Sequence, residues 1–378
     1  MKLYLVAGEA SGDEHGAALM RALRQFSPEI EFHGRGGPKM QSVAGKSLIN
    51  WSDSAAVVGL WEVLKRYRYF RGQFQCALAE ISQVRPDAVV LIDYPGFNLR
   101  LARALRFGQR SSRFGGRIIY YISPQVWAWN RGRIREMARY LDLMLCIFPF
   151  EAELYNQSGL RTVFVGHPMI QNLASLRTDI ARQQNLIGIF PGSRLREIRT
   201  IFPIMMEAGE RIVSKRREVR FEVAAASESL LVELEGMLST QSIRDQTTIV
   251  RQDAAGTMQR AFAGLVASGT ATLEAAYFRL PFVLVYKVSW LTYIAARCVV
   301  KTDFLGMPNI LANEEIVREF IQHQARPEAI ARAVLDLMND QAARDRMKNE
   351  FDAIISKLGE GGASERAAKV LLDELASG

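Results

Sequence analysis

Ten short apolar runs alternate with helical patterns along this chain of 378 residues, and no other feature restricts its fold as strongly. The first half contains KLYLVAG, AVVLIDY, RIIYYIS, LMLCIFP and RTVFVG, and the second contains LIGIFPG, RFEVAAA, TTIVRQ, GLVAS and FVLVYKV. Continuous apolar runs that end in turn residues, rather than strictly alternating runs, indicate strands covered by helices on both faces. The sequence therefore predicts an α/β protein built from doubly wound parallel sheets.

Length and one polar stretch predict two such domains. A chain of 378 residues is longer than a single hydrophobic core normally fills. Residues 170–184 are polar and carry no strand pattern, and they separate two halves that each open with a strand, a small-residue turn and a helix. We expect one Rossmann-like domain at 1–172, joined by a C-terminal helix at about 350–378, and a second at 173–349.

The positive charge of the chain is concentrated in one region. The net charge is +8, and the stretch from Leu99 to Arg139 holds ten arginines against one acid, Glu136. A basic field of this kind attracts nucleic acid, anionic lipid or a phosphorylated substrate alike. Charge therefore leaves these three kinds of partner open.

Cysteine usage and hydropathy predict a cytoplasmic protein. The three cysteines lie far apart, which fits neither a disulfide framework nor a zinc site. The N-terminal residues lack the regions of a signal peptide. The longest apolar stretch, residues 280–300, is interrupted by Lys287 and Arg297, so we expect no membrane span.

The turn after the first apolar run reads GEASGD and carries two acids. Its glycines match neither a dinucleotide fingerprint nor a Walker loop. Glu9 and Asp13 would repel a diphosphate, so they suit the hydroxyl groups of a sugar, with Ser11 beside them. The alternative is that Ser11 and Asp13 only cap the following helix.

Two turns in the second half have the opposite character. In PGSR, backbone N–H groups lead into a helix beside an arginine, and SGTATLE repeats the pattern with a glutamate one turn later. Such turns bind phosphate, and the glutamate is placed to accept hydrogen bonds from a ribose diol. The predicted nucleotide contacts are Gly192, Ser193, Arg194, Ser268, Gly269, Thr270 and Glu274, with Asn309 in a later loop. The alternative interpretation is a pair of well-capped core helices.

Asp93 is the predicted general base, because it directly follows a buried strand at the edge where open α/β sheets bind their ligands. A lone aspartate at a strand end is otherwise a cap. His15 is an alternative base. No histidine pair has metal-ligand spacing, and no nucleophile elbow is present.

The stretch from Val57 to Phe74 alternates apolar and basic residues, which is typical of a segment that lies in a membrane interface. Burial in the core is the alternative. The predicted membrane contacts are Leu60, Trp61, Leu64, Lys65, Arg66, Arg68, Phe70 and Arg71.

Taken in order, these motifs resemble the lipid-A-disaccharide synthase family, which are inverting glycosyltransferases. The matching segments are GEASGD, GGPKM, IDYPGFN, SPQVWAW, FPFE, VGHP, PGSR, SGTATLE and PNILA. The resemblance implies a GT-B fold, whose two domains face a central cleft, with the acceptor on the N-terminal domain and the UDP-sugar donor on the C-terminal one. The reaction joins UDP-2,3-diacylglucosamine to 2,3-diacylglucosamine 1-phosphate. It forms a β-1,6-linked disaccharide 1-phosphate and UDP.

The resemblance also implies roles, partners and a location. Asp93 corresponds to the base, Arg194 and Glu274 to donor contacts, and Asn309 to a loop over the nucleotide, while Trp127 and the acidic turn line the acceptor. No metal or other cofactor is expected, and no nucleic-acid partner. The family is peripheral on the cytoplasmic face of the inner membrane, and a homodimer is compatible with it.

The chain departs from the family pattern in two places, and two other functions remain open. Asn313 and Glu314 stand where Gly-Arg usually follows PNILA, and Asn130 stands where an arginine is common. A UDP-N-acetylglucosamine epimerase of the same fold and a peripheral adaptor that binds anionic lipid are the alternatives. A nicotinamide dehydrogenase is disfavoured by the missing fingerprint.

Overall fold

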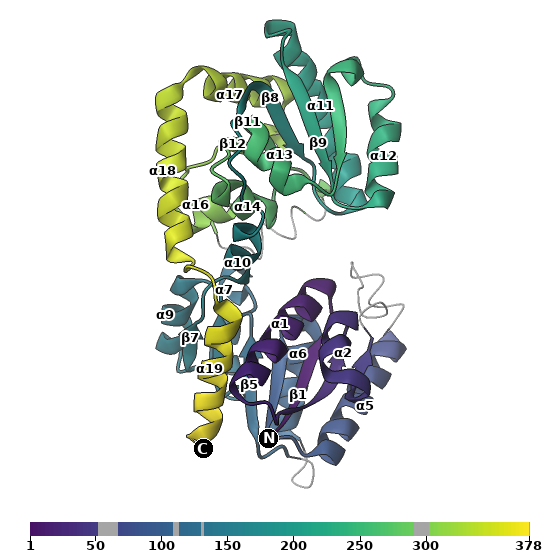
Figure 1. Cartoon of the computed structure of the whole chain (residues 1–378), viewed down its shortest axis with the longest axis vertical. Coiled ribbons are helices and arrows are strands. Elements are labelled where there is room, and N and C mark those ends of the chain that lie inside the picture. Colours follow the sequence, from purple (N-terminus) through teal and green to yellow (C-terminus); the bar gives the residue numbers. More distant parts are fainter. Residues whose placement is uncertain (52–66, 109–112, 130–131, 291–292, 294–301, 378) are drawn as a thin grey trace. The chain divides into compact units, whose positions relative to one another are not determined.

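The computed structural model describes residues 1–51, 67–108, 113–129, 132–290, 293 and 302–377. The chain divides into two compact units (Figure 1). Unit 1 comprises Met1–Pro168 and Leu358–Gly378, and unit 2 comprises Met169–Lys357. The sequence-based boundaries stand at 172 and 349. Within the described residues, no helix combines the length and hydropathy needed to cross a bilayer.

Unit 1 contains a seven-stranded sheet whose strands all run parallel, in the order β3-β2-β1-β4-β5-β6-β7. The strands are β1 (Lys2–Ala7), β2 (Glu31–Gly36), β3 (Leu48–Asn50), β4 (Ala88–Ile92), β5 (Arg117–Tyr121), β6 (Leu143–Cys146) and β7 (Thr162–Phe164). The five strands predicted in the first half are confirmed as β1, β4, β5, β6 and β7. The structure adds β2 and β3.

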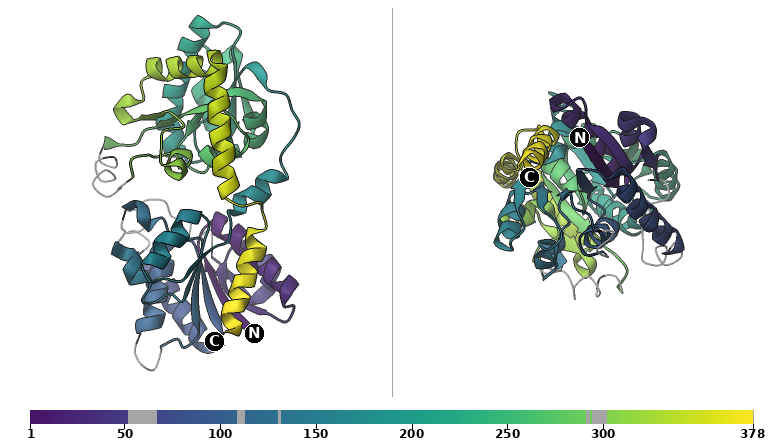
Figure 2. Two further views of the ribbon diagram at one scale, coloured as in Figure 1. Left: turned by 90° about the vertical axis from the view of Figure 1, so that its left-hand side faces the viewer. Right: turned by 90° about the horizontal axis from the view of Figure 1, so that it is seen from below.

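Successive residues of β1 point to opposite faces of this sheet, and both faces are buried. Leu3 and Leu5 pack with α1 (Ala10–Phe26) and α19 (Ala363–Ala376), whereas Tyr4 and Val6 pack with α5 (Tyr67–Val84) and α6 (Pro95–Phe107). This period of two, with apolar residues on both sides, explains why the strands read as continuous apolar runs. Figures 1 and 2 show α19 lying along the sheet of unit 1. Shorter helices complete unit 1: α2 (Pro38–Ala44), α7 (Val126–Trp129), α8 (Gly132–Met137) and α9 (Pro149–Gln157).

Unit 2 contains a six-stranded parallel sheet in the order β10-β9-β8-β11-β12-β13. Its strands are β8 (Gln183–Phe190), β9 (Arg220–Ala225), β10 (Thr247–Arg251), β11 (Ala261–Ala267), β12 (Phe282–Tyr286) and β13 (Glu319–Ile321). The five predicted strands are confirmed, and β13 is additional. The helices are α11 (Leu195–Lys215), α12 (Glu228–Leu238), α13 (Ala254–Arg260), α14 (Ala271–Tyr277), α16 (Met307–Ala312), α17 (Pro327–Asn339) and α18 (Gln341–Lys357), with α10 (Pro168–Ala174) at the start. The doubly wound fold class is therefore observed in both units.

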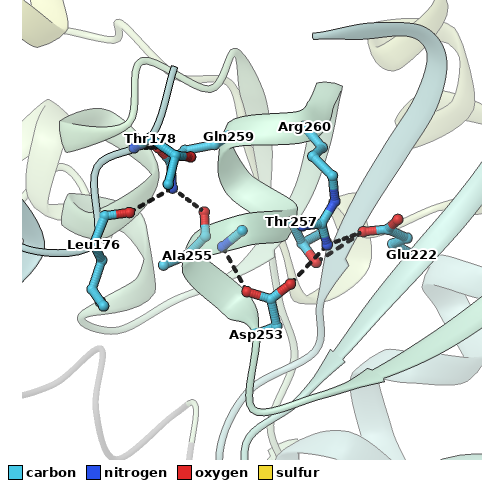
Figure 3. A network of polar contacts seen from close by, with 9 residues as sticks. Leu176, Thr178, Glu222, Asp253, Ala255, Thr257, Gln259 and Arg260 are labelled. Carbon is cyan, nitrogen blue, oxygen red and sulfur yellow. Dashed lines mark hydrogen bonds and ion pairs between the residues drawn. The ribbon is translucent and has the colours of Figure 1, made fainter. Parts of the chain in front are cut away.

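A polar network ties the first residues of unit 2 to its sheet (Figure 3). The Gln259 amide oxygen accepts from the Thr178 N–H at 2.6 Å, and its nitrogen donates to the Leu176 carbonyl at 3.0 Å. Arg260 donates to Glu222 on β9 at 2.9 Å and to Asp253 at 2.8 Å. Helix α13 is thus held on both sides, which positions the chain segment that enters β8.

Both sheets reverse their strand order at one point. In unit 1 the order changes direction between β1 and β4, and in unit 2 it changes between β8 and β11. At such a switch point the two neighbouring turns diverge to opposite faces of the sheet, and ligands bind in the resulting crevice at the carboxyl ends of the strands. The strand order therefore predicts one ligand-binding edge in each unit, at β1/β4 in unit 1 and at β8/β11 in unit 2.

Candidate functional site

The switch point of unit 1 brings the acidic turn beside Asp93. Ala7, the last residue of β1, pairs with Ile92, the last residue of β4, so Gly8 and Asp93 leave the sheet side by side. A Cβ atom on Gly8 would lie 2.3 to 2.6 Å from ring carbons of Tyr94, so a side chain there would collide with that ring. Glycine is required at this position because the Tyr94 ring packs on the backbone.

The backbone of Asp93 is held in an uncommon conformation. Asp93 and Tyr94 have φ angles of 45° and 51°, in the left-handed region that non-glycine residues rarely adopt. The Asp93 N–H donates to the Tyr121 carbonyl at 2.9 Å, and the Asp93 carbonyl accepts from the Asn98 amide at 2.8 Å and the Tyr120 hydroxyl at 2.5 Å. These bonds fix the turn that carries the carboxylate.

Burial and a neighbouring acid set the protonation of Asp93. Burial raises the pKa of Asp93 to about 6, the negative charge of Glu9 adds to this rise, and a hydrogen bond from the Tyr94 backbone opposes it. Glu9 is exposed at the start of α1, where its side chain makes no capping bond. A carboxyl group with a pKa near neutrality can accept a proton effectively during catalysis.

Asp13 has a structural task that the sequence did not reveal. Its side chain is buried, and its two oxygens accept from the N–H groups of Gly37, Lys39 and Met40 at 2.8 to 2.9 Å. These donors open α2, so Asp13 caps the next helix rather than its own. The cap joins the GEASGD turn to the GGPKM segment. Ser11 is exposed, and the direct binding of an acceptor by Ser11 or Asp13 stays a prediction.

Trp127 lies in a buried polar cluster centred on Glu151, a residue that the sequence analysis missed. The Trp127 indole N–H donates to Glu151 Oε1 at 2.9 Å, and the Ser123 hydroxyl donates to Glu151 Oε2 at 2.5 Å. Burial raises the pKa of Glu151 to about 7, although these bonds lower it. The cluster ties the SPQVWAW and FPFE segments together. One sequence signal could have indicated Glu151: it stands three residues after Phe148, at the N3 position of α9, where a glutamate often caps the start of a helix.

The switch point of unit 2 brings together the two phosphate-type turns. Phe190 at the end of β8 pairs with Val266 near the end of β11. Gly192 and Gly269 follow these strands with φ angles of +111° and +139°, which favour glycine. Ser193 and Thr270 are exposed beside them, and Ser268 is half-buried. The predicted donor residues before α11 and α14 thus share one edge of the sheet.

The Arg194 side chain forms an ion pair with Glu197 of α11, and this pair would have to separate before Arg194 could bind a ligand. It is 62% exposed, and its Nη1 atom lies 2.9 Å from Glu197 Oε1. A Cβ atom on Gly192 would lie 2.8 Å from Glu197 Oε2, which places this carboxylate over the glycine turn. The sequence analysis did not weigh Glu197. An exposed pair of this kind contributes roughly 0 to 1 kcal/mol, so little free energy is needed to separate the two side chains.

Glu274 lies one helical turn after Thr270. Burial raises the pKa of Glu274, and a hydrogen bond from the Thr270 side chain lowers it. The side chain is half-buried, which leaves part of it accessible at the β8/β11 edge. This placement is compatible with acceptance of hydrogen bonds from a ribose.

Asn309 is fully buried and organises its loop. Its amide nitrogen donates to the Val317 carbonyl at 2.7 Å and to Glu319 at 2.8 Å, while its oxygen accepts from the N–H groups of Ile316 and Val317. A donor contact through this amide stays a prediction. Asn313 ends α16 with a φ angle of 59°. Asparagine tolerates this left-handed conformation better than other non-glycine residues, which explains its presence at the glycine position of the family pattern.

Most of the predicted membrane segment lies outside the described residues. This applies to Leu60, Trp61, Leu64, Lys65 and Arg66. Arg68 and Arg71 are exposed on α5, whereas Phe70 packs partly buried against the core. No group of three or more His, Cys, Asp or Glu side chains is arranged as metal ligands in the part of the chain that the structure describes.

Comparisons with known proteins agree on one family. The family model described as lipid-A-disaccharide synthetase matches residues 3–372. A lipid-A-disaccharide synthase of Geobacter sulfurreducens is 36% identical over 99% of this chain and 97% of its own length. One from Coxiella burnetii is 34% identical over 98% of this chain and 97% of its own length.

A solved structure resembles the fold at low sequence identity. The UDP-GlcNAc 2-epimerase of Neisseria meningitidis, bound to UDP-GlcNAc, has a TM-score of 0.66 and 12% identity, covering 99% of this chain and 100% of that chain. At this identity the likeness shows only a shared architecture of two parallel-sheet domains, the GT-B fold. Combined with the full-length family match, it shows that the chain belongs to the lipid-A-disaccharide synthase family of glycosyltransferases.

Proposed function

We propose that Asp93 is the general base of the reaction that this family performs, the transfer of 2,3-diacylglucosamine from UDP to 2,3-diacylglucosamine 1-phosphate. The observation that carries this assignment is the position of Asp93 at the β1/β4 switch point, beside the acidic turn, with a pKa raised to about 6. At neutral pH this carboxyl group is ionised and ready to accept a proton.

The reaction is a single displacement. Asp93 takes the proton of the acceptor 6-hydroxyl, whose oxygen forms a bond to the anomeric carbon of the donor. The bond between that carbon and the UDP oxygen breaks, and UDP leaves with the electron pair. Configuration is inverted because attack and departure occur on opposite sides of the carbon.

The leaving UDP is stabilised by unit 2. Backbone N–H groups at the two glycine turns and the Arg194 guanidinium supply positive charge for the pyrophosphate, and Glu274 accepts from the ribose. Gly192, Ser193, Ser268, Gly269 and Thr270 form these turns. Unit 1 accordingly binds the acceptor and unit 2 the donor.

The acyl chains of both substrates favour attachment to a membrane. We place the protein at the inner face of the inner membrane, peripherally bound to an anionic surface through the basic region that includes Arg68 and Arg71. These two side chains are exposed on α5, which supports the assignment. We also propose that the protein forms a homodimer, which light scattering across a concentration series tests.

One assay separates this function from its alternatives. The purified chain is incubated with both acylated substrates, and mass spectrometry detects the tetraacyl disaccharide 1-phosphate together with released UDP. An epimerase would instead convert UDP-GlcNAc alone, and an adaptor would form neither product. The adaptor would also show no rise in melting temperature with UDP, since it has no nucleotide site.

A further inference from the structure

A basic groove opens on unit 1 at the edge of the sheet away from Asp93. It has a volume of about 910 Å³ and lies between the final turns of α5 and α6. Its lining includes Pro86, shortly before β4 begins, and Gly116, immediately before β5. Asp93 follows the opposite end of β4. The groove is therefore separate from the glycosyl-transfer site.

Four arginines among the described residues line this cavity, which we call the arginine groove: Arg85, Arg100, Arg103 and Arg113. None of the described lining residues is acidic. Arg103 pairs with Glu136 at 2.9 Å. The side chains of the other three are in exposed residues and make no hydrogen bond or ion pair with any residue that the structure describes. Their charge is thus available to an anionic ligand.

Part of the lining of the arginine groove is apolar. Leu78 and Ile81 of α5, Phe107 at the end of α6 and Phe114 lie among the basic lining residues. Phe107 is 51% exposed, which is unusual for so large an apolar side chain. The Phe114 ring lies close against the backbone of Gly116, where a Cβ atom would come within 2.6 Å of it. The ring is thereby held in the wall.

We propose that the arginine groove binds the headgroup of an anionic phospholipid. The phosphate accepts hydrogen bonds from the guanidinium groups, and the glycerol and first methylenes of an acyl chain lie against the aromatic and aliphatic walls. A duplex nucleic acid would use the arginines but leave the apolar lining without a partner, and a base stacked on Phe107 would leave the aliphatic Leu78 uncovered. The inference rests on the proposed membrane attachment and names a specific lipid site for it.

Vesicle binding by a triple variant tests this site. The variant Arg85→Gln, Arg100→Gln, Arg113→Gln removes the three arginines that lack partners. The probe is phosphatidylcholine vesicles with and without phosphatidylglycerol, at low salt. Since each arginine near an anionic surface contributes a factor of about five, we expect affinity for the anionic vesicles to fall about a hundredfold. Phe107→Ser is expected to lower it by a few-fold even at high salt.

The matched control changes the same number of charges elsewhere. Arg217, Arg244 and Arg346 are exposed on unit 2 and make no ion pair within the described chain. Their triple replacement by Gln should reduce vesicle binding no more than about twofold. Equal losses in both triple variants would overturn the site, because they would indicate a diffuse charge effect.

Two further measurements, of glycosyl transfer and of RNA binding, complete the test. Glycosyl transfer with detergent-dispersed substrates should be unchanged in the groove variant, which also shows that it is folded. If wild type lacks this transfer yet the groove variant alone loses vesicle binding, the lipid site stands and the proposed reaction fails. Unaltered vesicle binding by the groove variant, or a loss confined to binding of an RNA oligonucleotide, rejects the lipid site.

Discussion

The two switch points of this protein share a topology and differ in chemistry. At the β1/β4 edge of unit 1 the chain places Glu9 and Asp93, whereas at the β8/β11 edge of unit 2 it places glycine turns and Arg194. Parallel sheets with the same strand reversal thus carry residues of opposite charge at corresponding edges. Strand order indicates the edge at which a ligand is expected, while the residues that follow the strands set the charge that the ligand would meet.

Each edge also perturbs its own charged groups in a way that suits its task. In unit 1, burial and the Glu9 charge raise the pKa of Asp93, so the carboxyl group gains affinity for a proton. In unit 2, Arg194 is exposed, and its ion pair within the described residues is with Glu197 of α11. A base benefits from the first environment and an anion-binding cation from the second.

The largest expected effect comes from Asp93→Asn, which removes the base but keeps the shape of the side chain. We expect turnover to fall by about 10² to 10⁴ because proton transfer by a positioned group supplies acceleration of that order. UDP should still raise the melting temperature, since unit 2 is intact. Asp87→Asn, immediately before the same strand, is the control. Near-normal turnover in folded Asp93→Asn would remove Asp93 from the role of base.

The second-largest expected effect comes from Arg194→Gln, which removes the positive charge from the β8/β11 edge of unit 2. Loss of one electrostatic donor to the leaving group typically costs about a hundredfold or more in rate. UDP affinity, measured by calorimetry, should weaken as well. Arg196→Gln changes an exposed arginine two residues later and should have little effect. A full rate in the Arg194 variant would show that the turn N–H groups suffice.

Asp13→Ala tests the role of Asp13 as the cap of helix α2. Three N–H groups of the α2 start would lose their acceptor, so we expect unfolding to become easier by about 3 kcal/mol. Chemical denaturation measures this change. Glu14→Ala removes the exposed pair with Lys39 and should cost less than about 1 kcal/mol. Equal stability of both variants would contradict the capping role.

The smallest effect concerns pH. Because the Glu9 charge raises the pKa of Asp93, Glu9→Gln should lower that pKa from about 6. Asp93 is active when deprotonated, so kcat/KM rises with pH through its pKa. In the variant this rise should occur at lower pH, by less than about one unit. Glu14→Gln serves as the charge-matched control. An acidic limb that does not move would separate Glu9 from Asp93.

Sequence patterns located ten strands, most of them buried on both faces, and missed three others. β2 reads EFHGRG and carries Arg35, which is only 4% exposed and donates to Glu80 on α5 at 3.1 Å. The polar residues of β2 do not look like a buried strand in the sequence. Arg35 can be buried because its partner Glu80 comes from α5, which is distant in the chain. β3 (LIN) and β13 (EFI) have three residues each and, unlike the equally short β7 in RTVFVG, are not part of a longer apolar run.

The residues of the candidate site also divide into those that the sequence indicated and those that only the structure revealed. Local order along the chain was enough to single out Asp93, Arg194 and the glycine turns, because a turn after a buried strand presents its residues at one edge of a sheet. It did not reveal Glu151 or Glu197, whose contacts depend on how neighbouring segments pack. Nor did it show that the amide of Asn309 is already occupied within its own loop.

By itself, the sequence determined the fold class, ten of the thirteen strands in the described residues and the residue types that follow those strands, since these follow from periodicity and local turn chemistry. Only the tertiary structure decided which turns become neighbours, which carboxylate caps a helix and which rises in pKa. Those properties depend on strand order and burial, and both arise from contacts between residues far apart in the chain.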